Sequence, residues 1–334
     1  MQHEDSIGPR KRVLYVVTRP DFFSQNGGVG GHITHAHGVV SGLSANDREV
    51  LVVAGDYTNC APYTRHFPVC GSGRLLWTIR LLRTLNAIAR ANPDLEFVYI
   101  RYAAAISPLL PVIRLVFRGI PIVMEVNSLA SQSVRAWRFI DRAALSDVDV
   151  VLVVSNELRE FVLSEISPAL SSSLLVLPNG VDPERFSRTG RATPPSSDRP
   201  FVFGYVGVLK PGYGLEELIR AFVTFVNGGA NAHLRIVGAG PQLADLEAEF
   251  GSEERVQFTG GFDYAEVESA YAGIECLLYS TSQANAFQSP IKVLEYMLTG
   301  VPILAARTPS TARMLDGGRL GALYKLDDRS SLID

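Results

Sequence analysis

Residues 201–226 read FVFGYVGVLKPGYGLEELIRAFVTFV, and this stretch indicates the fold class. It begins with a continuous apolar run, Phe201–Val206, which is typical of a strand buried on both faces. A glycine-rich junction follows at 207–214, and residues 215–226 then repeat apolar side chains at helical spacing. A buried strand, a short loop and an amphipathic helix together predict one step of a parallel α/β sheet.

The same alternation continues to the C-terminus. It predicts strands at 234–237, 256–259, 276–279 and 302–305, separated by helices at 241–250, 265–272 and 290–298. Short β-branched runs predict further strands in the first half, at 13–17, 50–53, 97–100, 120–124 and 148–154. Helical spacing occurs at 33–43 and 75–90, and in the second helix we expect one apolar face made of Leu75, Leu76, Ile79, Leu82 and Ile88.

The two halves are separated by a polar stretch at 187–200, SRTGRATPPSSDRP, which has the composition of a linker. We therefore expect two Rossmann-like α/β domains, residues 1–186 and 201–334, whose parallel sheets face a central cleft. Ligands bind beyond the carboxyl ends of the strands in such sheets, so this cleft is the expected site.

The composition excludes several classes of protein. Of the 334 residues, 47% are hydrophobic and 19% charged, which is too apolar for a disordered chain. The three cysteines lack metal-ligand spacing, so neither a metal site nor a disulfide is expected. A net charge of −3 without a basic, aromatic-interleaved stripe disfavours nucleic acid as a partner. The chain has no long apolar run, and we expect a cytoplasmic protein.

Two junctions combine glycines with features that suit an anion. Residues 26–32 read NGGVGGH before a helical pattern, and Gly28 and Gly30 let the backbone approach a diphosphate closely. A flexible surface loop is the alternative interpretation. Residues 207–214 offer Lys210 beside Gly212, and Gly238 begins a third junction, GAGP.

The most specific junction is SPIKVLEYM at 289–297. Here Ser289 is predicted as the N-cap of a helix, with Lys292 in its first turn and Glu295 three residues further along. A cation in a first turn is unfavourable unless an anion binds there, so the pattern favours a bound phosphate. A surface ion pair of Lys292 and Glu295 is the alternative. Only 4 of the 31 basic residues are lysines, and two of them fall at these junctions.

With these motifs the chain resembles the retaining, nucleotide-sugar-dependent glycosyltransferases of family 4, which have the GT-B fold. The resemblance covers about residues 12–324 and rests on four pieces in order: NGGVGGH, LPNGVDPERF at 177–186, GYVGVLKPGYGLEELIRAF with LRIVGAGPQLADLE, and SPIKVLEYMLTGVPILA. It implies a nucleoside-diphosphate sugar as donor substrate, no metal cofactor, and an acceptor that is a glycan, a lipid-linked molecule or a small molecule.

The resemblance also implies roles for individual residues. Glu295 is expected to bind the ribose hydroxyls, and Lys210 and Lys292 the diphosphate. Gly260 and Phe262 are expected near the nucleobase. The remaining donor-binding candidates are Gly28, Gly30, Gly212, Tyr213, Gly238 and Ser289.

Three positions depart from the family pattern. Phe287 stands where a first carboxylate is usual, and Tyr213 stands where a basic residue is usual. Residues 125–128 read EVNS where a histidine is common. The departures occur together in a subset of the family that has SPxKxxEYM, and they indicate a subtype.

The catalytic candidates are Glu125, Asn127 and His32. Retention in the family is ascribed to front-face displacement, in which the leaving phosphate helps to take the acceptor's proton. Glu125 and Asn127 are then expected to orient the acceptor hydroxyl and the reacting sugar, and His32 occupies the family's loop-to-helix position. The alternative is that Glu125 pairs with a neighbouring arginine or caps a turn.

The segment 71–118 has a net charge of +5 and includes an apolar stretch at 109–117, which suggests peripheral contact with the inner face of a membrane. Core-facing helices with solvated arginines are the alternative. For the whole chain, two other functions stay open: a nucleotide-sugar-binding homologue without turnover, and a GT-B-like nucleotide-sugar epimerase. The chain ends at Asp334, where the family would continue into a closing helix, which we expect to be missing.

Overall fold

The computed structural model describes residues 10–23, 31–57, 62–71, 73–181, 183, 199–262, 267–283 and 289–333. These residues form two compact units, one within Met1–Ser24 and Ala36–Pro178, the other within Gln25–His35 and Asn179–Asp334. Most of the predicted linker, 187–198, lies outside the described residues, so the predicted domain limits stay a prediction.

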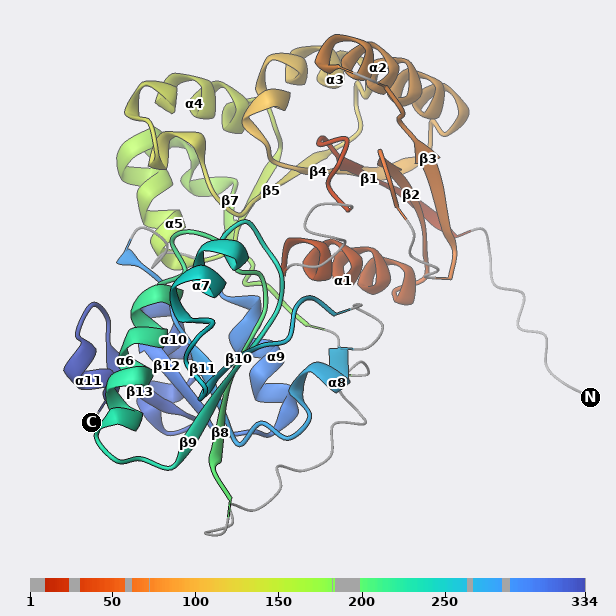
Figure 1. Ribbon diagram of the computed structural model, residues 1–334. Helices are drawn as coiled ribbons and strands as arrows, with labels where there is room; N and C mark the ends of the chain where they lie inside the picture. Colours follow the sequence, from red (N-terminus) through yellow and green to blue (C-terminus); the bar gives the residue numbers. More distant parts are fainter. Residues whose placement is uncertain are drawn as a thin grey trace, which may run out of the picture. The chain divides into compact units, whose positions relative to one another are not determined.

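The first unit contains a parallel sheet of seven strands in the order β3-β2-β1-β4-β5-β6-β7 (Figure 1). Parallel neighbours require crossover connections, and helices supply most of them. The strands are β1 (Lys11–Val17), β2 (Arg48–Ala54), β3 (Thr64–Pro68), β4 (Leu95–Arg101), β5 (Ile122–Val126), β6 (Val150–Val153) and β7 (Leu174–Val176).

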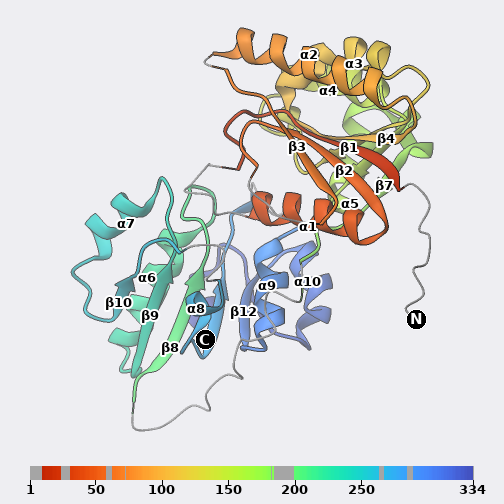
Figure 2. The same cartoon turned by 90° about the vertical axis from the view of Figure 1, so that its right-hand side faces the viewer.

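Helices cover both faces of this first sheet. Helices α2 (Arg74–Ala91) and α3 (Leu110–Val116) lie on one face and α1 (Gly31–Ala45) lies on the other, as the two views agree (Figures 1 and 2). The other elements are α4 (Arg138–Ser146), α5 (Asn156–Phe161), the π turn η5 (Val162–Ile166) and the 3-10 turns η2 (Ala104–Leu109), η3 (Ala130–Gln132), η4 (Arg135–Trp137) and η6 (Pro168–Ser172).

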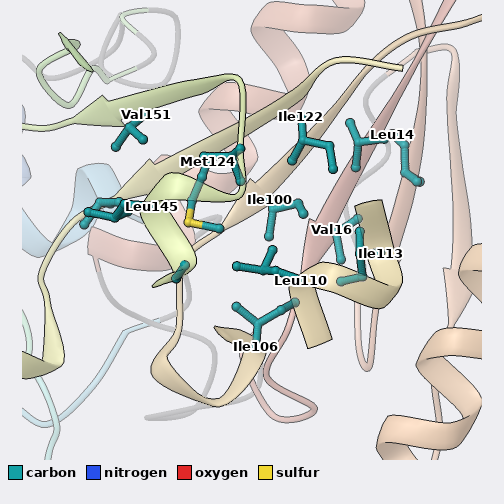
Figure 3. Close-up of a cluster of buried hydrophobic side chains, with 14 of the residues drawn as sticks. Leu14, Val16, Ile100, Ile106, Leu110, Ile113, Ile122, Met124, Leu145 and Val151 are labelled. Carbon is teal, nitrogen blue, oxygen red and sulfur yellow. The ribbon is translucent and has the colours of Figure 1, made fainter. Parts of the chain in front are cut away.

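The core of the first unit lies between the sheet and helices α2, α3 and α4. Leu14, Ile100 and Met124 point from neighbouring strands toward Leu110 and Ile113 of α3 (Figure 3). All five side chains are almost completely buried. Close packing of this kind fixes the sheet and therefore the positions of the residues at its carboxyl edge.

The structure corrects the predicted apolar face of α2. Its buried residues are Trp77, Leu81, Leu85 and Ile88, whereas Leu75, Leu76 and Ile79 are exposed. The face that begins at Trp77 repeats over three turns and packs on the sheet. The prediction is right for Ile88, which is buried, and for Leu82, which packs partly buried on the core, and it is wrong for the three residues at the start of the helix.

The second unit contains a parallel sheet of six strands in the order β10-β9-β8-β11-β12-β13. The strands are β8 (Phe201–Val206), β9 (Ala232–Val237), β10 (Val256–Phe258), β11 (Cys276–Tyr279), β12 (Ile303–Arg307) and β13 (Ala322–Lys325). The helices are α6 (Leu215–Asn227), α7 (Leu243–Phe250), α8 (Val267–Tyr271), α9 (Ile291–Thr299), α10 (Pro309–Met314) and α11 (Arg329–Ile333), with the 3-10 turn η10 (Asp316–Gly318).

Two apolar clusters pack on the two faces of the second sheet. One contains residues of α6 and α7, including Phe222 and Phe250, and the other contains residues of α8 and α9, including Tyr271 and Tyr296. The two Rossmann-like parallel sheets confirm the predicted α/β architecture. Strands β3 and β7 were not predicted, because their sequences, TRHFP and LLV, are polar or very short.

Candidate functional site

The second sheet has its topological switch point between β8 and β11, because the strand order runs in opposite directions from these two neighbours. A crevice at the carboxyl ends of such strands is the usual ligand site. Four loops meet at this edge: 207–214 after β8, 238–242 after β9, 259–262 after β10 and 280–283 after β11.

The loops at this edge contact one another through their backbones. The amide of Gly238 donates to the carbonyl of Gly260 at 2.7 Å, and the amide of Leu209 donates to the carbonyl of Ala239 at 2.9 Å. Gly238 has φ +153°, and a Cβ there would overlap the carbonyl of Gly207. Glycine is therefore required at Gly238 by the close approach of two loops, whatever binds beside them.

Lys292, on the first turn of α9, extends under the β8 loop. A Cβ on Gly207 would lie 2.5 Å from Lys292 Cε, so this glycine leaves the space that the lysine occupies. The Nζ atom hydrogen-bonds to the hydroxyl of Tyr205 and lies 3.9 Å from the centroid of that ring. Burial lowers the pKa of Lys292 to about 7; Glu295 raises it and Lys210 lowers it.

Lys210 lies in the β8 loop beside Tyr213. Its Nζ atom is 4.6 Å from the centroid of the Tyr213 ring, and Lys292 Nζ is 4.9 Å from the same centroid. The switch point therefore brings two lysines 82 residues apart in sequence onto one aromatic side chain. A site with two neighbouring ammonium groups suits a ligand with two negative charges.

The prediction that Ser289 is an N-cap is wrong. Helix α9 begins after Pro290, and no side chain caps it. The Ser289 hydroxyl instead accepts from the backbone amide of Asn179 at 3.3 Å, and the Asn179 side-chain amide donates to the Ser289 carbonyl at 2.7 Å. Ser289 therefore hydrogen-bonds to Asn179 and does not cap α9. Asn179 belongs to the LPNG motif at 177–180, but it was not among the predicted site residues.

The carboxyl edge of the first sheet contains a buried polar cluster around Glu125. Arg101 Nη1 lies 2.9 Å from Glu125 Oε1, and the Tyr99 hydroxyl donates to Glu125 Oε2 at 2.9 Å. The side-chain amide of Asn127 also donates to Glu125. Burial lowers the pKa of Arg101, but Glu125 and the neighbouring Tyr15 raise it, and the result lies above its ordinary value.

The alternative interpretation of Glu125, an ion pair with a neighbouring arginine, is therefore present in the structure. Its role in the reaction stays a prediction. Sequence reasoning did not find Arg101 or Tyr99 as site residues, although Arg101 ends β4, the strand that pairs with β5, and is the register partner of Glu125.

The remaining predicted residues have less structural context. His32 is half-buried in the first turn of α1, next to Gly31, where a Cβ would lie 3.4 Å from Ile291 Cβ. Phe262 is partly buried against the cluster that contains Tyr271. Gly28, Gly30 and Phe287 lie outside the described residues.

Two family models match the chain in succession. The model described as Glycosyltransferase Family 4 matches residues 29–185, and the model described as Glycosyl transferases group 1 matches residues 200–334. The chain belongs to glycosyltransferase family 4. This confirms the family that the motifs predicted.

Several curated proteins are similar to parts of the chain. A D-inositol 3-phosphate glycosyltransferase of Corynebacterium jeikeium is 27% identical over 229 residues, which cover 62% of this chain and 54% of that protein. A 2-deoxystreptamine glucosyltransferase of Streptomyces kanamyceticus is 29% identical over 141 residues, 39% of this chain and 35% of that protein. The matches therefore span about a third to a half of the length of these relatives.

Solved structures share the GT-B fold. A sucrose-phosphate synthase of Thermosynechococcus elongatus superposes with a TM-score of 0.77 at 16% identity, covering 97% of this chain and 88% of that one. The Anabaena protein HepE, in complex with UDP and glucose, superposes with a TM-score of 0.69 at 17% identity and the same coverage. At these identities the likeness concerns the fold alone.

Membrane-spanning helices and metal clusters are both absent from the part of this family 4 chain that the structure describes. No helix in that part is both long and apolar enough to cross a membrane. The same residues bring together no group of three His, Cys, Asp or Glu side chains that would hold a metal ion.

Proposed function

We propose that the chain transfers a sugar from a nucleoside-diphosphate sugar to an acceptor hydroxyl with retention of configuration. The observation that supports this best is the pair of lysines, Lys210 and Lys292, at the switch point of the second sheet. In glycosyl transfer the diphosphate of the donor already carries two negative charges and gains a third as its bond to the sugar breaks, so fixed cations at its position stabilise the transition state.

In this proposal each end of the donor has its own residues. Lys210 and Lys292 supply positive charge to the leaving diphosphate, so no metal ion is needed to stabilise its negative charge. Glu295, one helical turn after Lys292, accepts hydrogen bonds from the two ribose hydroxyls. Gly260 and Phe262, in the loop after β10, lie beside the nucleobase. The complex of HepE with UDP and glucose is consistent with such a donor.

For the acceptor side we propose that Asn127 and Glu125 act as a pair. Glu125 is anchored by Arg101 and Tyr99, and it accepts from the amide of Asn127. Because the NH2 group of the Asn127 side chain donates to the Glu125 carboxylate, the side-chain oxygen of Asn127 points away from Glu125. We propose that this oxygen accepts a hydrogen bond from the acceptor hydroxyl, with His32 as a further contact to the reacting groups.

The acceptor that we propose is a glycan or a lipid-linked molecule, used at a membrane surface. The exposed side of α2 and α3 supports this, because Leu75 is 73% and Leu115 is 71% exposed there. Neither helix contains an acidic residue, and Arg83 and Arg90 are exposed on α2. Apolar and cationic side chains on one surface suit an anionic bilayer. Among the relatives, a lipopolysaccharide 1,6-galactosyltransferase of Salmonella typhimurium is 28% identical over 182 residues.

A two-stage assay tests this function. UDP-, GDP-, ADP- and TDP-sugars are first screened for a rise in melting temperature, because a ligand of the native state stabilises it. The stabilising donor is then incubated with glycan and lipid-linked acceptors in EDTA, and the anomeric configuration of the product is read by NMR. The proposal expects nucleoside diphosphate release with a retained anomer, and a large loss of rate in Lys292→Met.

The same assay separates the two other functions. Donor binding with neither transfer nor hydrolysis would indicate a nucleotide-sugar-binding protein without turnover. Conversion of the donor into its epimer, with no acceptor consumed, would indicate an epimerase. An inverted product anomer would contradict the proposed retention.

A further inference from the structure

We propose that Tyr213 is a positioning residue that holds the ammonium groups of Lys210 and Lys292 against its ring, so that both charges meet the diphosphate. This inference rests on the proposed function for the identity of the ligand. It concerns a position at which the family pattern has a basic residue and this chain has a neutral aromatic one.

The first support is the distance of each ammonium group from the ring. Lys210 Nζ and Lys292 Nζ lie over the Tyr213 ring, 4.6 Å and 4.9 Å from its centroid. Both distances are within the range of about 6 Å in which the negative face of an aromatic ring attracts a cation. Two like charges would otherwise repel each other, and the ring offers both of them one attractive surface.

The second support is the way in which the ring itself is held. Tyr213 packs against the apolar cluster around Tyr205 and Leu215. Its carbonyl accepts from the Ser280 hydroxyl at 2.6 Å, and the neighbouring Gly212 carbonyl accepts from the Ser282 amide at 3.0 Å. Both partners follow β11, on the other side of the switch point. The loop is therefore fixed before any ligand binds, which is the condition for preorganisation.

The two lysines differ in how much they depend on Tyr213. Lys292 also contacts Tyr205, through a hydrogen bond to its hydroxyl and at 3.9 Å from its ring centroid. Among the described residues, Lys210 has no carboxylate within ion-pair distance, and its Nζ atom lies over the ring of Tyr213. Removing the Tyr213 ring is therefore expected to release Lys210 and to leave Lys292 partly held.

This dependence can be measured without a ligand. The chain has four lysines, Lys11, Lys210, Lys292 and Lys325, so a protein labelled with 13C at the lysine ε-carbons gives few signals. We expect ring-current shifts for Lys210 and Lys292 relative to the exposed Lys11 and Lys325. Tyr213→Leu should move the Lys210 signal to the position of the exposed lysines and move the Lys292 signal less. Tyr213→Phe keeps the ring and should leave both signals in place.

The consequence for binding is tested on the same variants with the nucleoside diphosphate that stabilises the wild type. Tyr213→Leu should weaken diphosphate binding about fivefold or more, in line with a lost cation–π contact. Binding of the matching nucleoside monophosphate should change less, because it lacks the second phosphate. In a Lys210→Met background, Tyr213→Leu should cause little further loss of diphosphate affinity, because the lysine that depends most on Tyr213 is already absent.

Several results would overturn the inference. One is a Lys210 signal that is the same in Tyr213→Leu as in the wild type, and another is full additivity of the effects of Tyr213→Leu and Lys210→Met. An equal loss of monophosphate and diphosphate binding would show that Tyr213 contacts the nucleoside directly. If the wild type binds no nucleoside diphosphate, the proposed function fails, and the ligand-free NMR result still decides whether Tyr213 positions the lysines.

Discussion

Arg101 and Glu125 are register partners on the neighbouring strands β4 and β5, and their side chains form a 2.9 Å ion pair inside the first unit. Arg101 is 8% and Glu125 2% exposed. Taking two charges out of water is unfavourable, and removing one partner leaves the other charged and buried. The pair therefore predicts a strong and unequal response to single and double substitution.

Glu125→Leu should lower the free energy of unfolding by about 3–5 kcal/mol, because it leaves the Arg101 guanidinium buried without its anionic partner. The double variant Arg101→Met/Glu125→Leu should recover most of that loss, since it removes both charges and keeps apolar volume. Urea denaturation of the three proteins measures this. A double variant as unstable as the single one would refute the pairing as the cause.

The same double variant tests catalysis separately from folding. If Glu125 positions Asn127 for the acceptor, the stable double variant should bind donor normally and turn over much more slowly. Turnover at the wild-type rate would restrict Glu125 to a structural role.

Lys292 should couple donor binding to proton uptake. Its pKa is about 7 in the free protein, and a bound diphosphate stabilises the protonated form. Above that pH the free lysine is largely neutral, so binding takes up a proton and affinity falls as pH rises, by up to about tenfold per unit. Calorimetry at pH 8 in two buffers of different ionisation enthalpy measures the uptake. Lys292→Met should show none, and a buffer-independent wild type would contradict the prediction.

The effect of the same lysine on stability has the opposite sign. Since folding lowers the pKa of Lys292 from its ordinary value of 10.5, the unfolded chain binds more protons between about pH 7 and 10.5. The contribution of Lys292 to stability therefore rises with pH across that window. Lys292→Met should flatten the pH dependence of the melting temperature there, and an unchanged profile would argue against a lowered pKa.

Gly207→Ala should displace Lys292. The new Cβ would lie 2.5 Å from Lys292 Cε, at a residue with φ +148°. We expect a loss of stability on the order of 1–3 kcal/mol from backbone strain, together with weaker diphosphate binding. Gly229→Ala is the matched control, because Gly229 also has a positive φ, +103°, but nothing lies within 4 Å of its added Cβ. If Gly207→Ala and Gly229→Ala bound the diphosphate equally well, Gly207 would have no role in the diphosphate site.

The exposed side of α2 should decide membrane binding. Replacing Leu75, Leu76 and Ile79 by serine should abolish flotation with vesicles that contain phosphatidylglycerol and leave the melting temperature almost unchanged, because all three are exposed. Leu320→Ser, at an exposed leucine of the second unit, is the control. High salt should weaken wild-type binding through the arginines. Flotation of the triple variant, or none of the wild type, would refute the membrane contact.

Much of this fold could be predicted from the sequence because each strand and each strand-to-helix junction has a recognisable pattern within a few residues. Apolar strand runs and glycine-rich junctions identified the α/β alternation, and the lysines at two of those junctions lie together in the structure. The predicted face of α2 was wrong at Leu75, Leu76 and Ile79 because the first turns of this helix carry apolar residues on more than one side, and only the packing partner decides which side is buried. That partner is a sheet whose strands come from distant parts of the chain.

The site residues that sequence reasoning missed depend on pairing between distant segments. Arg101 meets Glu125 only through the register of β4 and β5, and Ser289 meets Asn179 across 110 residues. Tyr205 is an ordinary strand residue until α9 brings Lys292 beneath it. None of these relationships has a local signature, whereas Gly207 and Lys292 were visible within their own motifs.

The central proposal is that the switch point of the second sheet binds the diphosphate of the donor. Titration of matched nucleoside diphosphates and monophosphates into the wild type and Lys292→Met, followed by calorimetry at pH 7, tests it most directly. The wild type should prefer one diphosphate over its monophosphate by about tenfold or more, and Lys292→Met should lose most of that preference, with the remainder due to Lys210. Equal affinities in the wild type, or an undiminished preference in Lys292→Met, would contradict this assignment.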